Sequence, residues 1–471
     1  MYVSQINTFQ KFKDDISLQD NICIIPIYYD KYGYSYNSDI SLIYIYCFST
    51  DTLLSCCFTH YDGIINNFGI TPDIFIEYIC NIPTISNIFI YKKQKHLGLF
   101  SKKTQYKKNI IDIDMLSYYI TGKALTYTHT NKIPYIDSMN INNKLNIIIP
   151  INIHTNICME IIESLKIFID KLAITNDDIT NIISKKDFKY LNILEIHMLY
   201  LLECNGVFCD KNIIKKIFPD KINIIPFFKE NYLFNNINPF TTTGRPIINN
   251  FGIDLATLNK KDGSRSIITS RFGSQGKIVA IDYDSYQLRL IAFLLHIDIP
   301  KNKSLHDYLG ENYYFQKKEL TPEERDESKN ISFKLIYGGI DDKYLTIPFF
   351  KNIADFTNTI WESFIKNNYI TTFIFHRPLY NYFFTSAMFK SKLLSYILQN
   401  LETERNMMVL NKLFKSGLFD NKYKSKLILY QYDCFIFDVY NEESTFIPKV
   451  VEIMEEGGFK TKIKEGPTFN M

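Results

Sequence analysis

No part of this sequence contains the run of about eighteen apolar residues that a membrane-spanning helix requires. Its first residues, MYVSQINTFQKFKDD, have neither the apolar core of a signal peptide nor the Arg- and Ser-rich character of a transit peptide. None of the nine cysteines stands in a C-x-x-C pair, and such scattered cysteines are typical of reduced, mostly buried thiols. We therefore expect a cytoplasmic location and no membrane partner.

A strong charge of either sign is also absent, because 53 Lys and Arg residues stand against 50 Asp and Glu residues, a net charge of +3. This balance neither favours nor excludes a nucleic-acid partner, and any basic groove has to be local. No internal repeat is visible. What the chain does have is length, since 471 residues with 46% hydrophobic residues can build two or three domains with their own cores.

The organisation of the chain changes twice along its length. Residues 1–150 contain apolar runs separated by turns, such as NICIIPIYY, SLIYIYCFS, TLLSCCFTH and NIFIYKK, which predict strands, while IDMLSYYITG has helical character, so an α/β domain is expected. Residues 151–240 carry apolar residues at three- and four-residue spacing, which predicts a helical connector. In residues 241–471, strand-like runs such as GKIVAIDYD alternate with long helical stretches, and KLILYQYDCFIFDVY predicts a hairpin of two apolar strands with Asp433 in its polar turn. The expected fold class is therefore mixed α/β and α+β, with several domains.

The stretch RDESKNISFKLIYGG carries chemistry at a regular spacing, because Arg325, Lys329, Phe333 and Tyr337 recur at every fourth residue. On an α-helix these residues share one face about 18 Å long. Two cations can hold phosphates, and two aromatic rings can stack on a base and its sugar. Such a face fits a nucleoside triphosphate laid lengthwise, and the alternative is an amphipathic helix that buries its aromatic residues in a core.

This stretch resembles the nucleotide-binding helix of family A DNA polymerases, the bacterial DNA polymerase I family, whose pattern is R-x-x-x-K-x-x-x-F-x-x-x-Y-G. The resemblance implies that Arg325 and Lys329 contact the triphosphate, with Lys329 also taking a catalytic part. It further implies that Phe333 and Tyr337 pack on the sugar and the nascent base pair.

Two further segments resemble motifs of the same family, in the family's order. GKIVAIDYDSYQLRLIA resembles motif A, and KLILYQYDCFIFDVY resembles motif C, so Asp282 and Asp433 become the metal-binding catalytic carboxylates. Phosphoryl transfer between anions needs two divalent cations, and Mg²⁺, with Mn²⁺ as an alternative, prefers oxygen ligands. The resemblance also makes Tyr283 and Gln287 nucleotide contacts, whereas we expect Asp284 to be a bystander.

Three other segments resemble DNA-contacting parts of the family. TTTGRP makes Arg245 a candidate contact to the primer end and the incoming nucleotide. YILQNLETERNMM makes Gln399 a candidate contact to the template and primer, and FIFHRPLY, which resembles the family's G-R-R turn, makes Arg377 a candidate contact to the template. For these last two residues, an ordinary polar role at the surface remains the alternative. The segment LECNGVFCD resembles the helix end that precedes the thumb.

The sequence departs from the family pattern at motifs A and C. The Glu that usually follows the motif A Asp by five residues, where it blocks a 2′-hydroxyl, is Gln287 here, and the residues flanking Asp433 are Tyr432 and Cys434. We expect Gln287 to hydrogen-bond Tyr337 more weakly than a Glu does. The enzyme is then expected to admit ribonucleotides more readily than its Gln287→Glu variant.

The resemblance implies a right-hand polymerase with a palm, fingers at about residues 300–394 and a thumb. Only 34 residues separate Asp210 from Gly244, so either the thumb is shortened or the helices at 155–200 replace it. Residues 1–150 are similar in layout to the family's 3′–5′ exonuclease domain. That domain's two-metal site needs a D-x-E strand end, and here Asp30 has no partnering Glu. We expect a degenerate domain without proofreading, in which Asp112 and Asp114 do not bind metal.

Together these features predict a DNA polymerase that adds dNTPs to the 3′ end of a primer on template DNA. Its reduced form and AT-rich residue usage are typical of a phage or mobile-element replication enzyme, which would work in a host's cytoplasm. A short thumb predicts dependence on a processivity or replisome partner. The alternatives are a single-subunit RNA polymerase and a non-catalytic scaffold that binds nucleic acid or a replisome partner.

Overall fold

The computed structural model divides into two compact units, Met1–Cys204 and Asn205–Met471, and helix α9 (Ile196–Asn205) crosses their boundary. The stretch 151–240, expected as one connector, is therefore shared between the two units. Among the described residues, no helix is both long and apolar enough to cross a membrane. The structure describes residues 1–6, 8–28, 40–58, 70–100, 108–125, 138–140, 146–148, 151–172, 175–220, 231–248, 253–381, 387–418 and 422–471.

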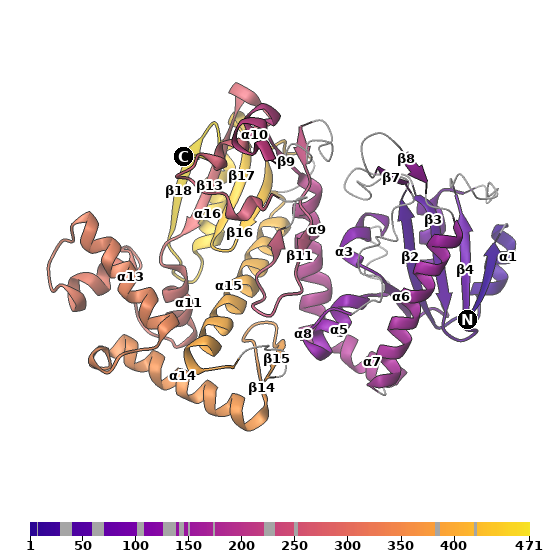
Figure 1. Ribbon diagram of the computed structural model, residues 1–471, viewed down its shortest axis with the longest axis horizontal. Helices are drawn as coiled ribbons and strands as arrows, with labels where there is room; N and C mark the ends of the chain where they lie inside the picture. The colour runs from indigo at the N-terminus through magenta and orange to yellow at the C-terminus, as the bar shows by residue number, and fades with distance from the viewer. Residues whose placement is uncertain are drawn as a thin grey trace. The chain divides into compact units, whose positions relative to one another are not determined.

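The first unit is built on a six-stranded sheet with the order β1-β4-β3-β2-β5-β6 (Figure 1). The central strands β2, β3 and β4 form an antiparallel meander, whereas β5 and β6 run parallel to β2 and β1 runs parallel to β4. Every residue of β3 is buried, because both faces of this strand are covered. The strands are β1 (Tyr2–Ile6), β2 (Asn21–Tyr28), β3 (Ile40–Cys47), β4 (Thr52–Cys57), β5 (Asn87–Ile90) and β6 (Asn109–Asp112), with a separate hairpin of β7 (Ser138–Asn140) and β8 (Asn146–Ile148).

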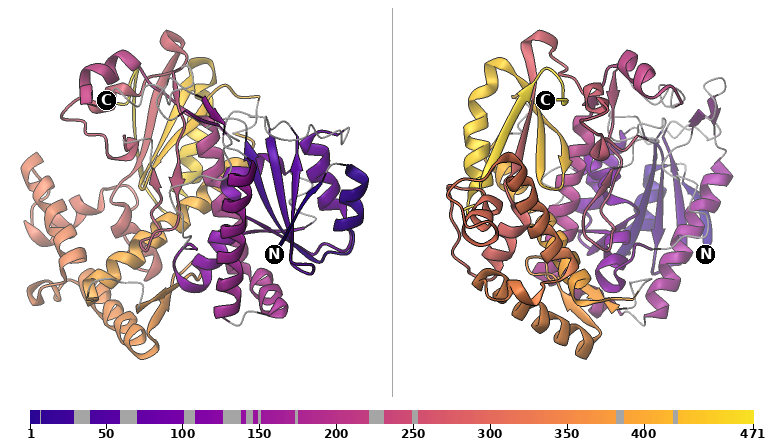
Figure 2. Two further views of the ribbon diagram at one scale, coloured as in Figure 1. Left: turned by 45° about the vertical axis from the view of Figure 1, so that its right-hand side comes forward. Right: turned by 60° about the vertical axis from the view of Figure 1, so that its left-hand side comes forward.

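Helices cover this sheet, and α6 (Ile151–Lys171) lies along one face of it (Figure 2). The Tyr44 hydroxyl of β3 donates a hydrogen bond to the carbonyl of Ile151 at 3.2 Å and lies 3.1 Å from the Thr155 hydroxyl. The strand and helix patterns expected in this part of the chain are confirmed for β2 to β5, for α5 and for α6. The other helices are α1 (Phe9–Ile16), α2 (Pro72–Asn81), α3 (Lys93–His96), α5 (Ile113–Thr121), α7 (Asn176–Ser184) and α8 (Lys186–Lys189).

The second unit contains a four-stranded antiparallel sheet with the order β16-β17-β13-β18. Strand β13 (Gly276–Tyr283) lies between β17 (Cys434–Tyr440) and β18 (Thr461–Gly466), and β16 (Lys426–Gln431) pairs with β17. The register places Asp282 of β13 opposite Cys434 on one side and Lys462 on the other. The expected hairpin around Asp433 is confirmed, since only two residues connect β16 to β17.

Short elements surround this sheet. Strand β9 (Val207–Phe208) pairs with β10 (Tyr232–Leu233), and β11 (Ile237–Asn238) pairs with β12 (Ile247–Ile248). Between residues 210 and 244, the described part of the chain contains one helix, α10 (Lys211–Ile217), while residues 221–230 lie outside the described residues. Helix α16 (Ile447–Glu455) joins β17 to β18.

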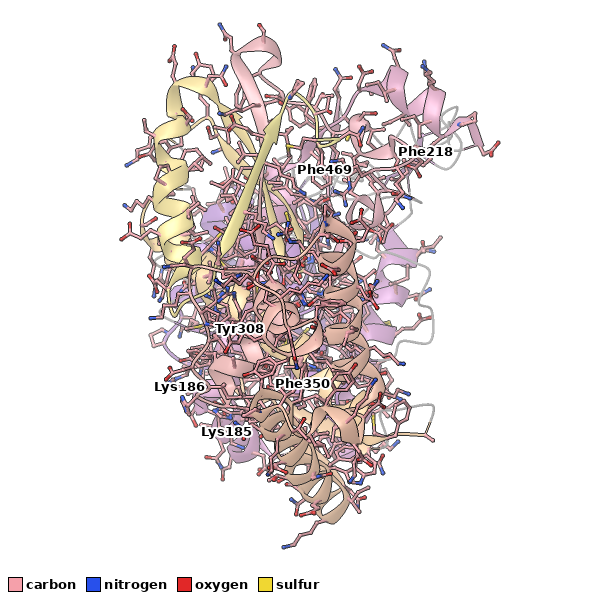
Figure 3. All side chains as sticks on the ribbon, turned by 90° about the vertical axis from the view of Figure 1, so that its left-hand side faces the viewer. Lys185, Lys186, Phe218, Tyr308, Phe350 and Phe469 are labelled. Carbon is pink, nitrogen blue, oxygen red and sulfur yellow. The ribbon has the colours of Figure 1, made fainter. Side chains whose placement is uncertain are left out.

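The rest of the second unit is helical and has its own core. Figure 3 shows Tyr308 and Phe350 among the side chains of this part, where Phe350 is fully buried in an apolar cluster. The long helix α15 (Lys390–Lys415) packs against α11, α13, α14 and α16 and so connects the helical part to the sheet. The remaining elements are α11 (Tyr286–Leu294), α12 (Leu305–Leu309), α13 (Pro322–Gly338), α14 (Pro348–Asn367), β14 (Tyr369–Thr371) and β15 (Pro378–Tyr380).

Candidate active site

Two carboxylates meet where β13 and the β16–β17 turn come together. Asp282 is the last residue of β13 that pairs with β17, and the backbone N–H of Tyr283 donates to the carbonyl of Asp433 at 3.0 Å. Tyr432, which precedes Asp433, has a left-handed φ of 53°. A non-glycine residue in that conformation carries strain, which proteins tolerate at turns that must aim a functional side chain.

The electrostatic environment of the two carboxylates opposes their negative charge. Burial, followed by repulsion from Asp433, raises the pKa of Asp282 to about 7, although Lys464, Lys462 and Lys329 act in the opposite direction. Partial loss of solvation by the surrounding protein also raises the pKa of Asp433, although this residue is exposed at the tip of the turn. Two adjacent carboxylates that repel each other form a donor set that fits a divalent cation.

The same carboxylates line a cavity of about 640 Å³ together with one face of α13. Arg325, Lys329, Phe333 and Tyr337 all line this cavity, so the prediction that they share a helix face is confirmed. The whole lining comprises Asp282, Tyr283, Asp284, Ser285, Tyr286, Gln287, Ser304, His306, Asp307, Arg325, Asp326, Lys329, Phe333, Tyr337, Asp433, Lys460 and Lys462.

The α13 face is cationic at one end and aromatic at the other. Arg325 donates through Nε to Asp307 Oδ1 at 3.0 Å but stays more than half exposed. Lys329 is exposed, and its ammonium lies 5.8 Å from the centre of the Phe333 ring. The Phe333 and Tyr337 rings stack with centroids 6.0 Å apart. The cations thus remain accessible to a ligand, whereas the aromatic rings are already ordered.

Gln287 does not make the expected hydrogen bond to Tyr337. Its Nε2 donates to Glu402 Oε2 of α15 at 3.2 Å instead, and its Oε1 is buried without a hydrogen-bond partner among the described residues. Burial raises the pKa of Tyr337 to about 12, so that its hydroxyl stays protonated. The expectation failed because a carboxylate on a distant helix, which local sequence does not reveal, competes for the amide.

Arg245 also binds Glu402. Its Nε donates to Oε1 and its Nη2 to Oε2, both at 3.0 Å, which is the bidentate geometry of a strong ion pair. The guanidinium lies 4.7 Å from the centre of the Tyr432 ring, next to Asp433. Arg245 therefore lies beside the β16–β17 turn that carries Asp433, although it does not line the cavity itself.

Tyr283 lies in the cavity wall with its hydroxyl occupied by another residue. The ring stacks on Tyr286 with centroids 4.1 Å apart, and its hydroxyl accepts a hydrogen bond from Arg405 Nη1 at 2.9 Å. Arg405 and Glu402 both belong to α15. This helix therefore contacts the cavity-lining residues from the side that faces away from the cavity.

The structure places Gln399 and Arg377 outside the cavity lining. Gln399 donates to Ser395 of its own helix at 2.8 Å, and Arg377 is 2% exposed and bonded to Asn400. Arg377 also lies 3.5 Å and 3.4 Å from the carbonyls of Thr241 and Thr242. These contacts hold the segment that leads to Arg245, and a DNA-contacting role for either residue stays a prediction.

Sequence reasoning missed several residues of the site. His306 lines the cavity with its ring centre 5.3 Å from that of Phe333, and burial lowers its pKa to about 4, which keeps it neutral at pH 7. Lys460 and Lys462 bring two more cations from the edge of the sheet. A histidine or lysine in a short segment carries no local signal that would distinguish it from a surface residue.

Asp284, expected to be a bystander, is buried in the cavity wall. It accepts from the Ser285 and Ser304 hydroxyls at 3.1 Å each and lies 3.2 Å from the Lys462 ammonium. Burial by itself would raise the pKa of Asp284, but Lys462 and the two hydroxyls outweigh this effect and lower it. Among the described residues, no group of three or more His, Cys, Asp or Glu side chains is arranged to hold a metal ion.

In the first unit, three lysines lie shortly after β5. Lys92, Lys93 and Lys95 lie within five residues of the end of β5, and the backbone N–H of Lys93 donates to Asp112 Oδ2 at 2.6 Å. Asp112 also accepts from the N–H of Met115 at 2.7 Å as the N-cap of α5. Both carboxylate oxygens of Asp112 thus accept hydrogen bonds from backbone N–H groups. Asp30 lies outside the described residues.

The sequence matches no protein-family model and no curated protein. Its structure is similar to a solved structure described as the POL domain of Pol1 from M. smegmatis in complex with DNA primer-template and dNTP. The match covers 99% of both chains with a TM-score of 0.68 and 12% sequence identity. The chain has the fold of a DNA polymerase domain. At this identity the likeness concerns the fold alone, so the roles of individual residues have to be argued from this chain.

The arrangement at the cavity is suited to the chemistry of phosphates. Two carboxylates, two exposed cations of α13 and a stacked pair of aromatic rings lie around one cavity. Phosphoryl transfer depends mainly on positioning and on stabilising charge, which such a set of groups provides.

Proposed function

We propose that this chain is a template-directed DNA polymerase that adds dNTPs to the 3′ end of a primer. The observation that carries the proposal is the single cavity in which Asp282 and Asp433 face the Arg325–Tyr337 side of α13. In this proposal the four-stranded sheet is the palm, and the helical part at about residues 300–394 forms the fingers. The polymerase fold of the solved structure described above supports the proposal.

Asp282 and Asp433 are the residues that would hold two Mg²⁺ ions, or Mn²⁺ as an alternative. Bound there, the ions supply charge stabilisation to the attacking and leaving oxygens of the phosphoryl group. The protein contributes the position of the carboxylates, fixed by the pairing of β13 with β17 and by the left-handed Tyr432.

The charged end of the cavity is suited to the triphosphate. Arg325 and Lys329 approach from α13, and Lys460 and Lys462 approach from the opposite wall. The exposed Lys329 ammonium, unlike the partly engaged Arg325, is free to contact phosphate oxygens and to donate a proton to the leaving group. His306 is neutral at pH 7, so it contributes a hydrogen bond rather than a charge.

The aromatic end of the cavity is suited to the nucleoside. Phe333 and Tyr337 stack on each other, and a sugar and base that pack against two rings already ordered by mutual contact lose less side-chain entropy. Tyr283 and Gln287 complete this part of the wall. We propose Arg245, Gln399 and Arg377 as contacts to the primer and template, with Arg377 acting mainly through the segment that carries Arg245.

We further propose that the chain lacks proofreading and that it belongs to a reduced, phage-like replication system with an external processivity partner. The lysines after β5 and the occupied oxygens of Asp112 support the first part, because neither leaves a carboxylate site for two metals. The single short helix described between residues 210 and 244 supports a reduced thumb and hence the need for a partner.

Primer extension with separate dNTP and NTP pools tests this proposal. Extension with dNTPs in Mg²⁺ is the expected result. Extension with NTPs alone would favour the RNA polymerase alternative, and binding of primer-template without any extension would favour a non-catalytic scaffold.

A further inference from the structure

Glu402 is a carboxylate buried in the middle of α15, with 1% of its surface exposed. It accepts hydrogen bonds from Nε and Nη2 of Arg245 at 3.0 Å each and from Nε2 of Gln287 at 3.2 Å. The three residues come from three different segments: the stretch before β12, helix α11 and helix α15. We call Arg245, Glu402 and Gln287 the buried triad.

We propose that Glu402 is a positioning residue for nucleotide selection, which supplies from α15 the carboxylate that position 287 lacks. The inference rests on the polymerase activity proposed above and deepens it. In the motif A pattern, a Glu stands at position 287. Here the residue at 287 is a neutral amide, and the negative charge lies within hydrogen-bonding distance of it on another helix.

The charges of the triad disfavour a glutamate at both position 287 and position 402. One anion and one cation balance each other in a buried place, and the neutral amide completes the carboxylate's hydrogen bonds. A second carboxylate at 287 would lie next to Glu402 with only Arg245 to compensate both charges. Burial already raises the pKa of Glu402, so additional negative charge there is strongly opposed.

The carboxylate also determines how Gln287 presents itself. An ionised carboxylate only accepts hydrogen bonds, so the Gln287 nitrogen has to face Glu402. The amide oxygen is then left as a buried acceptor without a partner among the described residues, on a side chain that lines the cavity. Glu402 thereby fixes the orientation of a cavity residue that it supports from behind.

The triad joins the two sides of the active site. Arg245 lies 4.7 Å from the Tyr432 ring beside Asp433, while Gln287 belongs to the helix that follows Asp282. A change at Glu402 is therefore expected to move both the β16–β17 turn that carries Asp433 and the part of the cavity wall that contains Gln287. When reacting groups are misplaced by about 1 Å, the reaction rate can fall on the order of a hundredfold.

The test exchanges the two side chains. Glu402→Gln removes the anion that compensates Arg245, and Gln287→Glu adds an anion beside Glu402. We expect each single variant to lose about tenfold or more in kcat/KM for dNTP incorporation, together with a reduced preference for dNTPs over NTPs. For Gln287→Glu this reverses the expectation drawn from the motif A pattern alone, because residue 287 contacts Glu402 and not Tyr337. The double variant Gln287→Glu/Glu402→Gln restores one anion, one cation and one amide, and it should return to within about threefold of the wild type.

The chain provides a matched control in Glu404, a second buried glutamate of α15. Its carboxylate accepts from the backbone N–H groups of Ile374 and Phe375 at 3.0 and 3.2 Å and belongs to no contact of the triad. Combining Gln287→Glu with Glu404→Gln also removes one buried anion from α15. We expect this pair not to recover, because the recovery requires the anion that touches residue 287.

Measurements well below the melting temperature of each variant separate positioning from mere stability. Recovery in the exchanged double variant but not in the control supports the inference. Single variants with lowered melting temperatures but unchanged kcat/KM and nucleotide preference would overturn it, and so would a double variant whose losses simply add. A wild-type protein that extends no primer refutes the proposed function instead, and the melting-temperature cycle still reports whether residues 287 and 402 are coupled.

Discussion

Asp282 stands beside Asp433 even though burial and the neighbouring negative charge both raise its pKa. The fold gains nothing from this repulsion, and perturbed carboxylates of this kind gather at functional sites. The left-handed Tyr432 at the same turn shows a second local cost at the same place. Both features are understandable if the protein is built to hold cations there.

Replacing Asp282 or Asp433 by Ala should abolish primer extension, because each variant loses half of the carboxylate pair. Primer-template binding should stay largely intact, since duplex affinity rests mainly on contacts to phosphates elsewhere. Extension assays and DNA-binding titrations measure the two effects separately. Asp341→Ala, which changes an exposed carboxylate outside the cavity, is the control, and substantial extension by either active-site variant would refute the assignment.

Lys329→Ala removes an exposed ammonium from the charged end of the cavity. A charge-assisted contact to phosphate is worth about 1.5–3 kcal/mol, so kcat/KM for dNTPs should fall about tenfold to a hundredfold. Lys334→Ala on the same helix is the matched control, because Lys334 is exposed but does not line the cavity. Equal nucleotide use by both variants would make α13 an ordinary amphipathic helix.

Among the elements, α13 and α15 divide the work of the site between them. Helix α13 presents its residues directly to the cavity, and its start is secured by a capping box between Thr321 and Glu324 with Pro322 in the first turn. Helix α15 acts from behind, through Glu402 and Arg405, which contact residues of the cavity wall. A change on the cavity face of α13 should therefore alter contacts to a ligand, whereas a change at Glu402 or Arg405 of α15 should alter the position of the cavity-lining residues.

Thr321→Ala should loosen the first turn of α13 without unfolding the unit. The loss of an N-cap costs about 1 kcal/mol, which corresponds to roughly fivefold faster hydrogen exchange at the amides of the first turn. Hydrogen-exchange mass spectrometry of the segment around Arg325 measures this, and Thr321→Ser should retain protection because its hydroxyl can still cap. Unchanged exchange in Thr321→Ala would show that packing alone holds the helix start.

At the scale of the whole molecule, the polymerase fold includes a first unit that buries two lysines in contact with its own polar groups. Lys93 Nζ donates to the carbonyls of Ile110 and Asn192 at 2.9 and 2.7 Å, and Lys95 forms an ion pair with Glu203. These buried cations occupy the region after β5 and give it a structural role.

Purified protein should therefore leave a mismatched primer 3′ end undegraded in Mg²⁺. The physical reason is that the lysines after β5 repel divalent cations, and that both carboxylate oxygens of Asp112 already accept hydrogen bonds from backbone N–H groups. A labelled mismatched primer followed over time provides the measurement. Cleavage that persists in Asp433→Ala would place a nuclease site in residues 1–150, whereas cleavage lost in that variant would point to reversal of polymerisation.

The sequence by itself determined the elements whose cause is local. Alternation and apolar runs predicted β2 to β5, β13 and the β16–β17 hairpin, because burying such runs requires those strands. The spacing of four predicted the shared face of Arg325, Lys329, Phe333 and Tyr337, because helix geometry places such residues together wherever the helix lies.

Only the tertiary structure decided which distant groups meet. Glu402 lies 115 positions from Gln287 and 157 positions from Arg245, and nothing near it in the chain names either partner. The polar stretch NLETERN lies between the apolar residues YIL and MMVL, which indicates buried polar contacts but not their identity. Local pattern reports the conformation of a segment, whereas a hydrogen bond between segments depends on how they pack, and so the partner of Gln287 became known only from the fold.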